Sequence, residues 1–117
     1  MSALGAWRAA VIAQLTPLGL RVVADPRAVN PPCVLVGVPT TVDLGANQCT
    51  VAAVLPVYVV APAPAQGSGV TWLVDNVVPV MRAINGRTAR AVDLSVSDGA
   101  PPQPAYQIDL SATIPDD

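Results

Sequence analysis

The most apolar stretch of the sequence is TVAAVLPVYVV, which runs from Thr50 to Val60. As an extended strand it is apolar on both sides, with Val57 and Val59 on one side and Tyr58 on the other. A strand of this kind needs cover on both faces. Pro56 has no N–H for a sheet ladder, so we expect the strand to bulge or to lie partly at a sheet edge. Such a position suits packing against a second subunit, and Val57, Tyr58 and Val59 are candidate interface residues.

The sequence before this strand predicts one helix and two short strands. Ser2 is a suitable N-cap for a helix whose apolar residues recur every three to four positions, and Pro17 marks the end of the pattern. Short apolar runs at residues 20–24 and 33–38 are typical of strands. We expect residues 40–48 to form a loop, because they contain turn-forming residues and follow a proline.

The sequence after the strand predicts a second helix and a hairpin. An apolar stripe begins near Ser68 or Thr71 and ends at Asn85–Gly86, a typical helix end. Apolar and polar residues then alternate at residues 92–97 and 106–113, on either side of a proline-rich loop. The whole pattern predicts an α+β fold: a single small domain, residues 1–117, with two helices packed on a mostly antiparallel sheet and a C-terminal β-hairpin.

The composition excludes most classes of catalytic and metal site. The 117 residues include six Arg and eight Asp but no Lys, Glu or His. A Ser-His-Asp triad, a P-loop and a two-Cys zinc site with His ligands are therefore impossible within one chain. We expect no enzyme, no catalytic residue, no metal and no cofactor. Only 12% of the residues are charged, which predicts surface hidden against partners, and a net charge of −2 gives no general attraction to nucleic acid.

The charged residues nevertheless suggest two candidate surfaces. Asp93 and Asp109 occupy the polar sides of two strands that we expect to pair, which predicts either an ordinary solvated face or an acidic surface past which a polyanion moves without binding. Arginines near the end of the second helix either cap that helix or pair with carboxylates of a partner. The candidate interface arginines are Arg27, Arg82, Arg87 and Arg90.

The cysteines and the apolar runs say less about function. Cys33 and Cys49 are expected to be buried thiols, although a disulfide between them is the alternative in an oxidising compartment. Polar residues and prolines interrupt every long apolar run, so we expect no membrane span. The apolar amino terminus is expected to be a helix rather than an export signal.

Taken together, these segments resemble the tail terminator, or tail completion, proteins of long-tailed bacteriophages, particularly those that infect actinobacteria. The resemblance covers nearly the whole chain. It rests on the amino-terminal helix, DPRAVNPPCVLVGVPT, TVAAVLPVYVVAP, GVTWLVDNVVPVMRAI and the closing hairpin that ends in SATIPDD. It implies a small α+β subunit that assembles as a ring, usually a hexamer, on the last ring of the tail tube. Such a ring stops tube polymerisation and provides the face on which the head docks.

The resemblance also implies partners and a location. The expected partners are further copies of the chain, the tail tube protein and a head-completion or connector protein. DNA only passes through the lumen, which Asp93 and Asp109 are expected to face. The protein would lie in the virion, at the head-tail junction, after assembly in the host cytoplasm and without contact with a membrane.

Three alternatives remain open from the sequence. The first is another phage neck or tail-tube component. The second is a small-molecule-binding α+β domain whose pocket lies between helices and sheet and uses Tyr58, Trp72 and Tyr106. The third is a secreted domain closed by a disulfide between Cys33 and Cys49.

Overall fold

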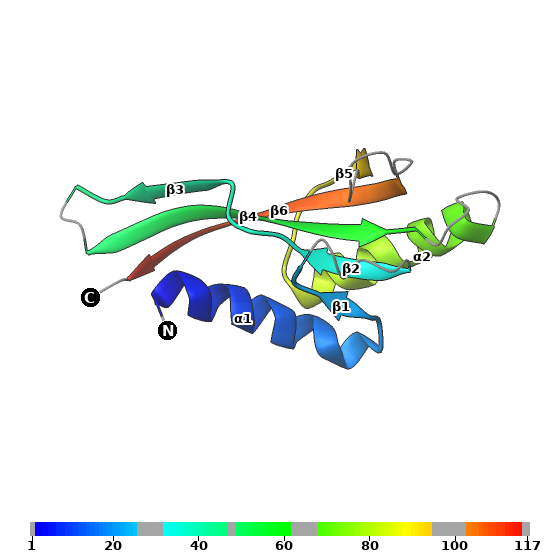
Figure 1. The fold of residues 1–117 in the computed structure, drawn as a ribbon, viewed down its shortest axis with the longest axis horizontal. Helices are drawn as coiled ribbons and strands as arrows, with labels where there is room; N and C mark the ends of the chain where they lie inside the picture. Colours follow the sequence, from blue (N-terminus) through cyan, green and yellow to red (C-terminus); the bar gives the residue numbers. More distant parts are fainter. Residues whose placement is uncertain (1, 26–31, 47–48, 62–67, 95–102, 116–117) are drawn as a thin grey trace.

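The fold is an α+β arrangement of two helices and a mostly antiparallel sheet of six strands (Figure 1). The computed structural model describes residues 2–25, 32–46, 49–61, 68–94 and 103–115. Its elements are α1 (Ala3–Leu15), the short 3-10 helix η1 (Thr16–Leu18), β1 (Val22–Val23), β2 (Cys33–Val36), β3 (Thr41–Leu44), β4 (Thr50–Val60), α2 (Ser68–Ala83), β5 (Ala89–Leu94) and β6 (Gln103–Pro115). The predicted fold class is confirmed.

The sheet is built around β4, the strand predicted from the apolar stretch. The strand order is β1-β2-β4-β6-β5, and β3 also pairs with β4, on the side where β2 lies. The β1–β2 pair is parallel and the other pairs are antiparallel. Because β3 and β6 are each antiparallel to β4, these two strands run in the same direction.

Pro56 lies within this central strand, so the expectation of an edge position is wrong. The pairing of β2 with β4 ends at Val57, and the pairing of β3 with β4 begins at Val54. The four residues 37–40 that join β2 to β3 therefore lie beside only two residues of β4. The N–H of Gly37 donates to the carbonyl of Pro56 at 2.9 Å, so the backbone of Pro56 faces this interruption. The missing N–H of the proline therefore falls where the neighbouring ladder is already broken.

A side chain from α1 holds the same interruption in place. Nε of Arg8 donates to the carbonyl of Gly37 at 2.7 Å, and Nη2 donates to the carbonyls of Val36 at 3.0 Å and Ala24 at 2.7 Å. Arg8 thus ties the first helix to the end of β2 and to the chain after β1.

Both helices pack against one face of the sheet, here called the helix face. Buried side chains of α1, α2, β2, β4 and β6 form one core there. Val57 and Val59 belong to this core and are 0% exposed, so their prediction as interface residues is wrong. The predicted start of the first helix is confirmed, because Ser2 Oγ accepts a hydrogen bond from the N–H of Gly5 at 3.0 Å.

The other face of the sheet, here called the opposite face, carries a smaller apolar cluster. Cys33, Val60 and Ala105 are buried there. Tyr58 is half-buried against this cluster, together with Val92. Tyr58 thus retains some exposed surface, whereas its neighbours on β4 do not.

Residues 40–48 do not form the expected loop, because residues 41–44 are the strand β3. With the first part of β4 and the last part of β6, β3 forms a three-stranded extension, here called the arm (residues 41–44, 50–54 and 111–115). Figure 1 shows the arm extending past the amino-terminal end of α1 along the long axis of the molecule. All four side chains of β3 are exposed.

Candidate functional site

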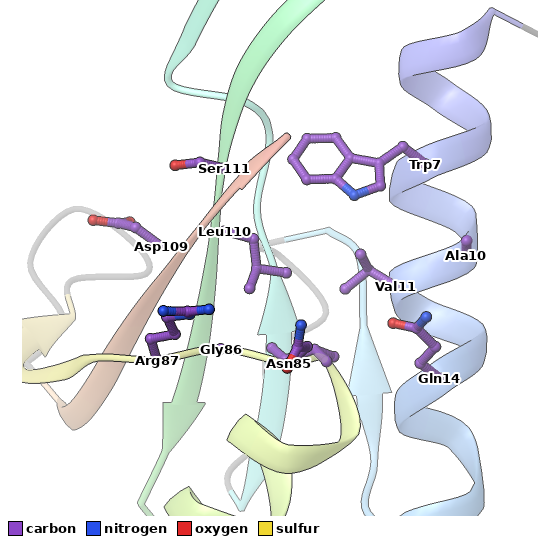
Figure 2. Close-up of a pocket in the computed structure, with 11 residues that line it drawn as sticks. Trp7, Ala10, Val11, Gln14, Asn85, Gly86, Arg87, Asp109, Leu110 and Ser111 are labelled. Carbon is purple, nitrogen blue, oxygen red and sulfur yellow. The ribbon is translucent and has the colours of Figure 1, made fainter. Parts of the chain in front are cut away.

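A cavity of about 460 Å³ lies between α1, the end of α2 and β6 (Figure 2). Its size falls in the range of about 300–1,000 Å³ that small-molecule sites occupy. The larger side chains that line it include Trp7, Val11 and Gln14 from α1, Asn85 and Arg87 after α2, and Leu110 from β6.

The cavity wall exists because α2 ends tightly against β6. Asn85 adopts a left-handed backbone with φ 57°, and the N–H of Gly86 donates to the carbonyl of Met81 at 2.8 Å. A Cβ at Gly86 would lie 2.6 Å from Cγ2 of Ile108, so glycine alone fits this close approach. The chain then turns outward and places Arg87 at the rim of the cavity.

The lining combines apolar side chains with polar ones, including Gln14, Asn85 and Arg87. In Figure 2 the indole of Trp7 extends towards β6, and Leu110 and Val11 lie between the helix and the sheet. Asp109 and Ser111 contribute to the cavity wall, but their side chains point away from Trp7. No carboxylate or nucleophile among the lining residues points inward.

The cavity lies beside a part of β6 that has a free edge. β5 begins at Ala89 opposite Ile108, whereas β6 continues to Pro115. Within the described residues, no strand pairs with the outer edge of β6 after Ile108.

Asp93 and Asp109 do not share a face, so the predicted common acidic surface is absent. Directly paired residues of an antiparallel sheet lie on the same face, and faces alternate along each strand. Asp93 pairs with Pro104 on the helix face, where it lines a groove beside α2. Asp109 lies on the opposite face, where its carboxylate is 3.9 Å from Nη2 of Arg90 and accepts a hydrogen bond from Nε2 of Gln107 at 2.9 Å.

The predicted interface arginines occupy different places. Arg82 lies in the last turn of α2, where a cation favours the helix end. Arg87 is at the cavity rim and Arg90 pairs with Asp109; all three arginines are exposed. Arg27 lies outside the described residues.

The three aromatic residues predicted to line a ligand pocket do not meet. Trp72 and Tyr106 pack at the core of the helix face, whereas Tyr58 lies on the opposite face. A single pocket between the helices and the sheet therefore cannot use all three. The groove beside α2, of about 410 Å³, contains Tyr106 without the other two.

The alternative of a disulfide between Cys33 and Cys49 is excluded by the fold, and the expected burial of Cys49 is wrong because this residue is exposed. Cys33 pairs with Val60 at one end of β4, and Cys49 precedes Thr50 at the other end. The intervening strand of 11 residues spans on the order of 30 Å, whereas bridged cysteines have Cα atoms less than about 7 Å apart. Cys33 is buried, as expected of a structural thiol, and Cys49 is exposed. Across the described ranges, no group of His, Cys, Asp or Glu side chains could hold a metal ion.

Two elements each expose more than one large apolar side chain, and Leu18 and Val38 are exposed singly. Val70, Val74 and Val78, here called the valine stripe, recur every four residues along α2 and are 46–53% exposed. Val70 and Val74 border the groove beside α2. On β3, Val42 is 50% and Leu44 is 64% exposed. The sequence predicted a core stripe on the helix and a loop at residues 40–48, so neither surface was predicted.

Comparison of the sequence with protein-family models and with curated proteins finds no match. None of the helices in the described ranges is long and apolar enough to cross a membrane.

Proposed function

We propose that this protein is a structural component of a long-tailed bacteriophage. As a tail terminator it assembles in a ring on the tail tube, stops tube polymerisation and provides the surface for head docking. The observation that carries the proposal is the presence of several exposed apolar side chains on each of two separate elements, the valine stripe of α2 and strand β3. Soluble monomeric proteins rarely expose large apolar patches, and such patches mark interaction sites. In a sequence with few charged groups, both surfaces therefore favour contacts with other subunits or proteins.

Two different apolar surfaces favour a head-to-tail assembly. When unlike surfaces of identical subunits meet, the two end subunits of an open series each keep one uncovered surface until the series closes on itself, and closure gives a ring. Ring formation is the central property of the proposed role.

The polar residues of β6 suit a surface past which DNA moves. Gln107, Asp109, Ser111 and Thr113 share the opposite face, and the charge of Asp109 is balanced by Arg90. Such a surface offers DNA no cluster of cations to bind. Under the proposal, this face lines the lumen and Asp93, on the helix face, does not.

The role is tested by adding the purified protein to growing tail tubes and imaging the tubes by electron microscopy. We expect tubes of arrested length with a distinct terminal ring, whereas tubes without the protein continue to grow. A Val74→Ser variant should lose capping, and Asp75→Asn, a change at the neighbouring exposed position, should retain it. Tubes that grow unchanged and bare in the presence of the native protein would refute the terminator role, and decoration along their length would indicate another neck or tail-tube component.

A further inference from the structure

The arm has two free sheet edges that differ from each other. One is the outer edge of β3, and the other is the edge of β6 after Ile108, beyond which no described strand continues the sheet. Free edges carry unpaired backbone donors and acceptors, which are templates for pairing with another chain.

The orientation of Pro56 determines which N–H and C=O groups of β6 point towards its free edge. The carbonyl of Pro56 points towards the β2 side of β4, so Pro56 and its partner Asp109 form a pair without mutual hydrogen bonds. The N–H and C=O of Asp109 therefore point outward, towards the residue that precedes β5. The alternation of a strand makes those of Ser111 and Thr113 point outward as well, and these lie on the free edge.

The register of β3 with β4 likewise determines which N–H and C=O groups of β3 point away from the sheet. The N–H of Gly45 donates to the carbonyl of Thr50 at 2.9 Å, which extends the register of β3 with β4 by one pair. Residues at odd positions of β3 therefore bond to β4, and Val42 and Leu44 direct their N–H and C=O groups away from the sheet.

The two edges match in the polarity of their faces. Val42 and Leu44 lie on the helix face, because they pair with Ala53 and Val51 of β4. Leu110 and Ala112 of β6 lie on the same face. On the opposite face, Thr41 and Asp43 of β3 correspond to Ser111 and Thr113 of β6. A β3 strand added to the β6 edge would thus continue both the apolar and the polar face of the sheet.

Pairing Asp43 of the added strand with Ser111 aligns the outward backbone groups of the two edges. Val42 then lies beside Leu110 on the helix face, where Leu110 lines the cavity. Asp43 and Ser111 lie on the opposite face. An acidic residue in a short edge strand discourages general pairing.

We infer that β3 of one subunit pairs, in parallel orientation, with the free edge of β6 of the next subunit. The inference rests on the proposed function, in that it supplies the contact between neighbouring copies of the ring. Because β3 and β6 run in the same direction within one subunit, a ring axis that lies close to the strand direction keeps β3 parallel to β6 of the neighbour. A two-fold dimer would instead pair like edges in antiparallel orientation.

The pairing is tested by disulfide cross-linking between two differently substituted proteins in a Cys49→Ser background. One protein carries Leu44→Cys and the other carries Ala112→Cys, two positions on the helix face. The matched control replaces the second protein by Thr113→Cys, whose side chain lies on the opposite face. Each mixture is oxidised with and without tail tubes, and the products are separated by mass.

We expect a mixed dimer from Leu44→Cys with Ala112→Cys and none from Leu44→Cys with Thr113→Cys. Dimers formed by Leu44→Cys alone would overturn the inference in favour of like-edge pairing. So would the absence of a mixed dimer under both conditions. Capped tubes without cross-links would reject this interface and leave the terminator role standing, whereas cross-links with uncapped tubes would support the interface and reject the role.

Discussion

Replacing Arg8 by Met should destabilise the protein by about 3 kcal/mol. The guanidinium donates to three carbonyls, of which those of Val36 and Gly37 are in part-buried bonds. A hydrogen bond to a charged group contributes about 1.5 kcal/mol or more, so the two part-buried bonds give about 3 kcal/mol and the exposed bond to Ala24 adds little. Methionine retains the packing of the aliphatic stem but leaves these carbonyls without a donor.

The assay is urea unfolding followed by far-UV circular dichroism and tryptophan fluorescence. At about 4 °C per kcal/mol for a domain of this size, the melting temperature should also fall by about 12 °C. Arg82→Met is the matched control, because Arg82 is exposed in the last turn of α2 and should change stability by less than about 0.5 kcal/mol. An Arg8→Met protein as stable as this control would show that the interruption between β2 and β3 does not need the arginine.

Three further changes separate the core from the exposed surfaces. Gly86→Ala should cost about 1–3 kcal/mol in urea unfolding because its Cβ meets Ile108, and stability equal to the native protein would contradict that approach. Val57→Ala should cost about 2–3 kcal/mol in the same assay, because the side chain is fully buried. Val78→Ala, at an exposed position, should cost less than about 0.5 kcal/mol. Equal losses of stability in the two variants would contradict the assigned burial. Val74→Ser should leave the melting temperature within about 2 °C but reduce assembly measured by light scattering, and unchanged assembly would remove the valine stripe from the interface.

Periodicity and end signals predicted most of the fold, because they act locally. The serine cap of α1, the Asn85–Gly86 end of α2 and the bounds of β4 are all confirmed. β3 was missed because a strand with four exposed side chains leaves no burial pattern in the sequence. Pro56 was placed at an edge because a sequence does not show that the neighbouring chain is interrupted beside it.

The candidate site was harder to predict because it depends on register. The apolar side of residues 92–97 was expected to face the same core as the apolar side of residues 106–113. The pairing of Val92 with Ala105 instead places Val92 on the opposite face and turns Asp93 towards α2. A shift of one residue exchanges the two faces of a strand, and only the tertiary structure fixes it. Val57 was misassigned for a similar reason, since a strand that is apolar on both sides does not indicate which side the helices cover.

The short length of β3 has a consequence for how the proposed ring would form. Only Val42 and Leu44 direct backbone groups outward, so one contact between subunits supplies few hydrogen bonds and is weak on its own. Closing the ring makes the last contact intramolecular, and a tube end that holds several subunits side by side raises their effective concentration. Assembly should therefore be strongly favoured on the tube and weak in free solution. The exposed Asp43 strengthens this dependence, because a charged side chain in a short edge strand discourages pairing in free solution.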